Sequence, residues 1–195
     1  DKKQKAFAAD VFVGLLESSY LQNEWKSVVN KVAAFEGLVA GSPIEQRARV
    51  LSGEAQFNLQ DFEAAAKAYE AAADLKGRDS GEALFRLGLV RLNHLKQYAA
   101  AAGHFKDFSA QHASDPKRAD ATFNEALCYY HSYYGGEEKH LADAIRLFDR
   151  FTAAYKKHDL ATVAQFYSGK LQHIRKDWAA AIKRFKPLED SKNPA

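Results

Sequence analysis

The stretch that decides the fold is GEAQFNLQDFEAAAKAYEAAADL, which runs from Gly53 to Leu75. Good helix formers with apolar or small residues at helical spacing lie on both sides of a break at Gln60-Asp61. Two helices joined by so short a break form an antiparallel hairpin. Gly53 and Ala65 are expected to lie where the two helices cross, because a larger side chain would push the helix axes apart.

The same order of small, aromatic or apolar, small and bulky residues occurs five times, and its anchor residues are separated by 37, 36, 43 and 37 positions. A period in this range predicts a stacked array of helices and an all-α fold. We expect a single array over residues 1–195, with repeats at 6–41, 43–77, 80–115, 117–157 and 160–190. The copies are Leu16, Trp25, Val28, Val32, Phe35; Gly53, Phe62, Ala65, Tyr69, Ala72; Gly88, Tyr98, Ala101, Phe105, Phe108; Ala126, Leu141, Ala144, Phe148, Phe151; and Gly169, Trp178, Ala181, Phe185, Leu188.

This pattern resembles the tetratricopeptide repeat, whose signature is W-x2-L-G-x2-Y, then A-x3-F, then P. The resemblance implies a right-handed α-α superhelix of about five hairpins that binds a peptide or helix of a partner protein without catalysis. The helix from Ala144 to Phe151, followed by Tyr155, is similar to that of bacterial envelope members of the family. Those members are the assembly lipoproteins of the outer-membrane β-barrel machinery and the coordinator of the Tol–Pal system, which implies a periplasmic location; the cytoplasm stays open.

The bulk composition excludes several other classes. A hydrophobic content of 47% excludes a disordered chain, and no apolar run reaches the roughly 20 residues that span a bilayer. The single cysteine, Cys128, excludes an internal disulfide and a cysteine-based zinc site, and we expect it to be buried. The absence of methionine, even at position 1, indicates a segment of a longer product.

The charge is uneven along the chain. The net charge is +3, but residues 139–195 hold 12 Lys/Arg against 6 Asp/Glu. This end could favour an acidic partner, or it could be a solvated lysine-rich surface.

No motif for catalysis, a metal or a cofactor is found. None of the seven histidines has another three or four residues away, and His140 with Asp143 offers only two ligands. Nucleophile-elbow, P-loop and dinucleotide-binding patterns are absent. We therefore predict no metal, no cofactor, no small-molecule substrate and no enzymatic activity.

The fourth copy carries an insertion. Fifteen positions separate Ala126 from Leu141, where other good copies have 9 or 10. Insertions in repeat proteins often lie on the binding face, and tyrosine is common at interfaces. Partner contacts are therefore predicted at Tyr133, Tyr134, Gly135 and Gly136. The alternative is that Tyr129 and Tyr130 pack inside a longer helix.

The resemblance also implies a concave groove lined by the first helix of each repeat. Phe85, Phe123 and Phe166 occupy equivalent places and would favour an apolar or amphipathic partner. A register one residue different would turn these rings between the helices instead. The implied groove residues are Val50, Glu54, Phe57, Phe85, Leu89, Leu92, Phe123, Leu127, Tyr130, Phe166, Lys170 and His173.

The sequence is also compatible with two other functions. A helical repeat of the pentatricopeptide type would bind RNA, but it needs polar base-contacting residues and a basic groove where this chain has phenylalanine. The chain could also be the helical interaction domain of a larger enzyme.

Overall fold

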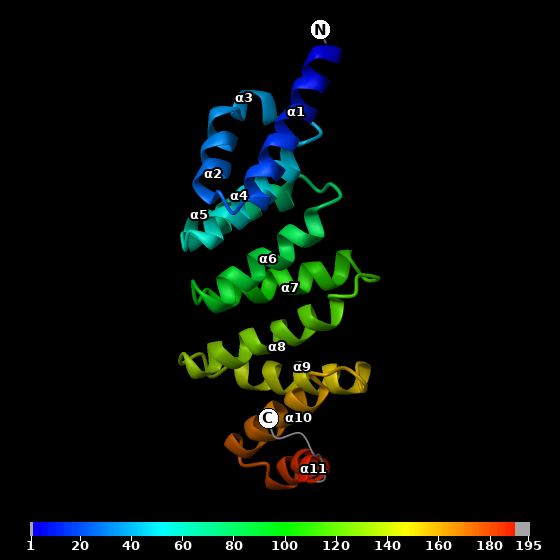
Figure 1. The fold of residues 1–195 in the computed structure, drawn as a ribbon. Coiled ribbons are helices and arrows are strands. Elements are labelled where there is room, and N and C mark those ends of the chain that lie inside the picture. The colour runs from blue at the N-terminus through cyan, green and yellow to red at the C-terminus, as the bar shows by residue number, and fades with distance from the viewer. Residues whose placement is uncertain (1, 190–195) are drawn as a thin grey trace. The chain divides into compact units, whose positions relative to one another are not determined.

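The computed structural model describes residues 2–189, and every regular element in that range is helical, which confirms the predicted all-α class (Figure 1). The longest helices are α1 and α8, and the shortest, α3, has a single turn. The helices are α1 (Lys2–Leu21), α2 (Trp25–Ala34), α3 (Glu36–Val39), α4 (Glu45–Asn58), α5 (Phe62–Asp74), α6 (Ser80–Asn93), α7 (Tyr98–Gln111), α8 (Arg118–Tyr134), α9 (His140–Ala154), α10 (Ala161–Ile174) and α11 (Trp178–Glu189).

The turns between paired helices share one backbone feature. Asn23, Gln60, Lys96 and Lys176 have φ angles of 59°, 64°, 56° and 63°, and each lies two residues before the second helix of its pair. In the fourth turn the left-handed residue is Gly136, with φ of 103°, four residues before α9. The fourth turn thus departs from the others, and the bounds of the five repeats stay a prediction. The predicted end of the fifth repeat, at residue 190, lies outside the described residues.

The chain divides into two compact units, Asp1–Lys96 and Gln97–Ala195. In the first, α1 packs on α2 and α4, α2 on α4, α4 on α5, and α5 on α6. In the second, α7 to α11 pack on one another in chain order (Figure 1). The boundary falls in the turn between α6 and α7, inside the third predicted repeat, and the single array over residues 1–195 stays a prediction.

Two glycines let an aromatic ring of one helix lie against the backbone of its neighbour. A Cβ added to Gly53 would lie 2.8 Å from the ring of Tyr69, which is almost completely buried. At Gly169 an added Cβ would lie 2.7 Å from the ring of Phe185. The small residues of the repeat are therefore needed where these rings pack.

A buried glutamine links three helices of the first unit. Gln46 Nε2 donates to the Ala72 carbonyl at 2.9 Å, and its Oε1 accepts from the Asp79 amide at 2.8 Å. A Cβ added to Gly77 would lie 2.5 Å from the same Oε1. Gln46, on α4, thereby satisfies backbone groups at the end of α5 and just before α6.

Aromatic rings from three successive helices form the core of the second unit. Phe148 and Phe151 of α9 are fully buried. The ring of Phe123, on α8, lies 5.7 Å from that of Phe148 and 5.5 Å from that of Phe151. Tyr167, on α10, stacks on Phe148 at 5.2 Å. These contacts fix α8 and α10 against α9.

Candidate functional site

The inserted residues mainly lengthen a helix. α8 has 17 residues, whereas α4, α6 and α10 have 14 each. Tyr129, Tyr130, Tyr133 and Tyr134 all belong to α8, as the alternative interpretation predicted for the first two. The exposed turn that follows reverses the chain at Gly136, whose positive φ favours glycine.

The structure brings residues of the two predicted sites together. Lys170 Nζ, on α10, donates to the Tyr130 hydroxyl at 2.8 Å. The same Nζ lies 5.5 Å from the ring centre of Tyr130 and 5.3 Å from that of Tyr134. The rings of Tyr130 and Tyr134 are 4.7 Å apart, and Tyr167 lies 4.8 Å from Tyr130. We call Tyr130, Tyr134, Tyr167 and Lys170 the tyrosine–lysine cluster.

The cluster holds a positive charge beside aromatic faces. Burial raises the pKa of Tyr130, although the hydrogen bond from Lys170 opposes that rise. The hydrogen bond to Tyr130 raises the pKa of Lys170, so the ammonium stays charged at neutral pH. Cations over tyrosine rings are attracted by the ring quadrupole. Lys170 is therefore held in place, and the residue as a whole is partly exposed.

Large aromatic side chains surround this charge at the surface. Tyr134 is 51% exposed and Phe166 is 41% exposed. Phe166, Lys170 and His173 are spaced four and three residues apart, which puts them on one face of α10. His173 is exposed and contacts the ring of Trp178 at 4.8 Å. The surface can therefore offer apolar contact around one fixed cation.

Of the three phenylalanines predicted to line the groove, only Phe166 is exposed, and the other two fit the alternative register. Phe85 is only 8% exposed and Phe123 only 6%, because their register turns the rings toward neighbouring helices. Phe123 packs on the core of α9, as described above. Leu127 and Tyr133 are partly buried against the same core. Within the second unit, Phe166 is thus more open to a partner than Phe123.

Most predicted groove residues of the first unit also pack against other side chains of the protein. Val50 and Leu92 are buried, and Leu89 is half-buried. Phe57 lies 5.6 Å from Phe62 and 5.2 Å from His94 in edge-on contacts. These side chains mainly stabilise the first unit.

Glu54 takes part in a network of side chains on three helices. Its carboxylate accepts a hydrogen bond from the Tyr20 hydroxyl and lies 3.1 Å from the Arg86 guanidinium. Arg86 also pairs with Glu82 at 2.6 Å. The hydrogen bond to Glu54 raises the pKa of Tyr20. Glu54 is therefore paired inside the protein, and its binding role stays a prediction.

The structure gives no support for a metal site or a membrane span within residues 2–189. No group of three or more metal-ligating side chains gathers there, and no helix is long and apolar enough to cross a membrane. Several histidines contact rings instead. His94 stacks on Phe62 at 3.8 Å, and His140 bonds to Ser132 at 2.7 Å. Cys128 is buried, and burial raises the pKa of its thiol.

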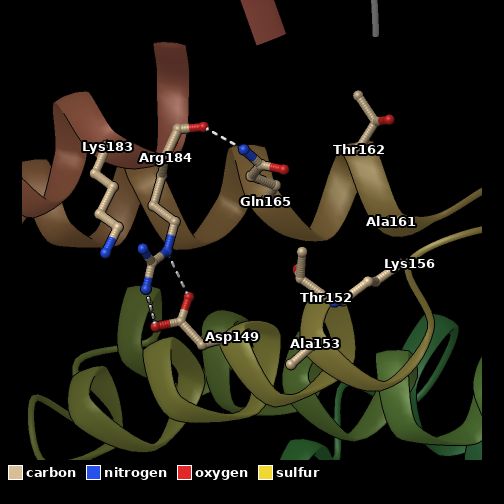
Figure 2. A pocket seen from close by; sticks show the side chains of 9 residues that line it. All are labelled: Asp149, Thr152, Ala153, Lys156, Ala161, Thr162, Gln165, Lys183 and Arg184. Carbon is tan, nitrogen blue, oxygen red and sulfur yellow. Dashed lines mark hydrogen bonds and ion pairs between the residues drawn. The ribbon is translucent and has the colours of Figure 1, made fainter. Parts of the chain in front are cut away.

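Asp149 anchors a groove between α9, α10 and α11 (Figure 2). Its carboxylate accepts from Arg184 Nε at 2.8 Å, Arg184 Nη2 at 2.6 Å and Ser168 Oγ at 2.5 Å. The Arg184 carbonyl accepts from Gln165 Nε2 at 2.7 Å. We call this space of about 450 Å³, which Lys156 and Lys183 also line, the α9–α11 groove. The ion pair neutralises its arginine and ties α11 to α9.

Replacing Asp149 by asparagine is expected to lower the free energy of unfolding at pH 7 by about 2 kcal/mol, the range for hydrogen bonds to charged groups. Burial raises the pKa of Asp149, but the hydrogen bonds from Arg184 and Ser168 outweigh it and hold the pKa below its ordinary value. A carboxyl group whose pKa is lower in the folded protein stabilises the fold at pH values above its pKa in the unfolded chain, which is about 4. This stabilisation is lost as the pH falls through the pKa of the folded protein. Urea unfolding at pH 7 and pH 3 should show the variant's deficit shrinking in acid. An equal deficit at both values would contradict the role of the charge.

The chain is similar in sequence and in fold to known proteins built from helical repeats. A model of the tetratricopeptide repeat matches residues 32–81 and 50–116, which together contain α4 to α7. Residues 32–116 of this chain are therefore similar to tetratricopeptide repeats. The matched residues include the most complete copy of the motif, Gly53 to Ala72. No curated protein sequence matches the chain.

Solved tetratricopeptide-repeat structures share the fold over nearly the whole chain. MamA from Desulfovibrio magneticus RS-1 is 17% identical, with a TM-score of 0.68 over 95% of this chain and 97% of its own. YrrB, described as a TPR protein with an unusual peptide-binding site, is 14% identical, with a TM-score of 0.66 over 92% and 84%. Pseudomonas aeruginosa pilF is 13% identical, with a TM-score of 0.61 over 98% and 80%. At these identities the likeness establishes the fold alone.

Proposed function

We propose that this protein is a non-catalytic scaffold that binds a segment of a partner protein at the tyrosine–lysine cluster. The observation that carries the proposal is the position of Lys170, which is held by Tyr130 beside the exposed Tyr134. Helical repeat arrays use their extended surfaces to hold other proteins. The peptide-binding site named for YrrB shows that a protein of this fold can hold a peptide.

The chemistry of the cluster defines the segment that would fit. An ammonium has three hydrogens, and Lys170 uses one of them on Tyr130. The others can reach a carboxylate or backbone carbonyl of a partner. Tyr134 and Phe166 supply large, rigid apolar contact, which is typical of interface anchors. A peptide or amphipathic helix with an apolar side chain next to an acceptor group would satisfy both.

The first experiment is a pull-down from the native source with the wild-type protein and the double variant Tyr134→Ala/Lys170→Ala. We expect the variant to lose at least about tenfold in captured partner, the equivalent of 1.4 kcal/mol. A matched control is Ile182→Ala/Lys183→Ala in α11 of the same unit, where Ile182 is 64% exposed. Circular dichroism should show that both variants remain helical.

Several outcomes would overturn this assignment. Equal capture by the wild-type protein and the cluster variant would place the binding surface elsewhere. Equal loss in the α11 control would indicate nonspecific adhesion to exposed side chains. Recovery of RNA rather than protein would favour the nucleic-acid alternative and refute the scaffold.

We also propose that the partner belongs to a bacterial envelope assembly and that the chain acts in the periplasm. The support is the likeness of the Ala144–Phe151 helix to envelope members of the family. Fractionation of the native cells, followed by immunodetection, tests this. Recovery in the periplasmic fraction is expected, and recovery only in the cytoplasm would contradict it.

A further inference from the structure

A second groove lies between α7, α8 and α9 and has a volume of about 640 Å³. Its lining includes four cationic side chains, which are Lys106 from α7, Arg118 from α8, and Arg146 and Arg150 from α9. Glu125 is the one carboxylate among the residues that line it. We call this space the α7–α9 groove. Its lining therefore carries a clear excess of positive charge.

The α7–α9 groove and the tyrosine–lysine cluster use different faces of α8. Thr122, Glu125 and Tyr129 line the groove at spacings of three and four residues. Tyr130 follows Tyr129 directly, and adjacent helical residues point about 100° apart at 3.6 residues per turn. Tyr130 accordingly contacts α10, while Tyr129 lies beside α9 in an edge-on contact with His140 at 5.1 Å. The two surfaces can act independently.

Most of the positive charge in the groove is not neutralised. Within residues 2–189, neither Lys106 nor Arg150 forms an ion pair, and both are exposed. Arg118 donates to the Ser109 carbonyl at 3.2 Å, which holds it in place without cancelling its charge. Arg146 pairs with Asp143 at 2.9 Å, but both side chains are well exposed, so this pair is weak.

Glu125 forms no close ion pair with these cations within the part of the chain that the structure describes. Burial raises the pKa of its carboxyl, and Arg150, Lys106 and Arg146 only partly oppose that rise. A carboxylate that sits beside several cations without a close ion pair reduces the potential of the groove. Its removal should therefore strengthen the attraction for an anion.

The equivalent groove one repeat later has fewer cations in its lining and holds one of them in an ion pair. Lys106 follows the buried Phe105 in α7, just as Asp149 follows the buried Phe148 in α9. In the α9–α11 groove, Asp149 binds Arg184 through two hydrogen bonds (Figure 2). The α7–α9 groove has a cation at the position where its neighbour has this anion. The lining of the α7–α9 groove therefore has four cations against one carboxylate, and that of the α9–α11 groove three against one.

We propose that the α7–α9 groove binds an acidic segment of a partner protein, held by Lys106, Arg118 and Arg150. Charge complementarity selects an anionic ligand. Single-stranded nucleic acid is less suited, because such sites present aromatic faces on which bases stack. The rings here are half-buried and already in contact, Tyr129 with His140 and Tyr155 with Phe151 at 5.1 Å. An acidic peptide can bind through the cationic side chains alone, provided that the groove has room for it.

Fluorescence anisotropy with a fluorescein-labelled oligoglutamate peptide at low salt tests the proposal. The double variant Lys106→Glu/Arg150→Glu is expected to weaken binding by about tenfold or more. The matched control is Lys156→Glu/Lys183→Glu, which makes the same change of charge in the α9–α11 groove and should weaken binding by about twofold at most. An oligoglutamine peptide with the same label should not bind.

A third variant gives the opposite expectation. Glu125→Gln removes the carboxylate from the groove with little change of shape, and binding of oligoglutamate should tighten by about threefold. This gain does not depend on a variant that could fail to fold.

Each remaining outcome would overturn the proposal. Equal weakening in the two charge-reversed pairs would show a response to net charge alone. Tighter binding of an oligouridylate, or full competition by millimolar inorganic phosphate, would identify a different ligand. Failure of oligoglutamate to bind the wild-type protein, or no gain with Glu125→Gln, would reject the groove as a site for acidic peptides.

Discussion

Replacing Phe148 by alanine is expected to lower the free energy of unfolding by about 3–5 kcal/mol, the range for removal of a large aromatic side chain from a core. Phe148 is fully buried on α9. Its ring contacts Phe123 of α8 and stacks on Tyr167 of α10, so its loss leaves a cavity among three helices. Urea unfolding followed by circular dichroism measures the change.

Phe166→Ala is the matched control for that variant. Phe166 is the same residue type in the same unit, but it is 41% exposed and lies at the surface of α10. We expect it to cost about 1 kcal/mol, because much of its area already contacts water. Similar losses in the two variants would contradict the packing described for the second unit.

Replacing Gly53 by valine is expected to lower the free energy of unfolding by about 1–3 kcal/mol. The new side chain would meet the ring of Tyr69, which lies 2.8 Å from the position of an added Cβ and is itself buried. The ring cannot move aside without separating α4 from α5. This steric cost exceeds the gain of a few tenths of a kcal/mol in helix propensity over glycine.

Gly14→Val in α1 of the same unit separates these two effects. No atom lies within 4 Å of a Cβ added to Gly14, so only the propensity gain should remain. We expect this variant to be as stable as the wild type or slightly more stable in the same urea titration. A stable Gly53→Val, or an equally damaged Gly14→Val, would show that close helix approach does not explain the glycine at position 53.

The sequence was sufficient to predict the helical hairpins and their period. Small and aromatic residues at fixed spacing, such as Gly53 and Tyr69, report contacts within one hairpin, which local periodicity can reveal. The orientation of Phe123 could not be read in the same way. A shift of one residue turns a helical side chain by about 100°, which decides between a groove and a core.

Local sequence patterns also could not predict that the side chains of the tyrosine–lysine cluster contact one another. Tyr130 and Lys170 are both predicted groove residues, but they lie 40 positions apart in the sequence. Their hydrogen bond depends on how one hairpin packs on the next. The sequence predicts Tyr134 in an inserted turn, whereas in the structure it lies on the longer α8, close to the Lys170 ammonium. The contrast between Lys106 and Asp149 could have been found by aligning the repeats on Phe105 and Phe148.

The most direct test of the proposed scaffold is photo-crosslinking from the tyrosine–lysine cluster. A benzoylphenylalanine in place of Tyr134 should form a cross-link to a protein in the native source, and Lys170→Ala in the same chain should reduce it strongly. The same probe in place of Ile182 serves as the control, because that side chain is exposed in the same unit but belongs to α11. A protein cross-link at position 134 and none at position 182 is the predicted result. Equal cross-linking at both positions, or cross-linking to RNA, would contradict the account.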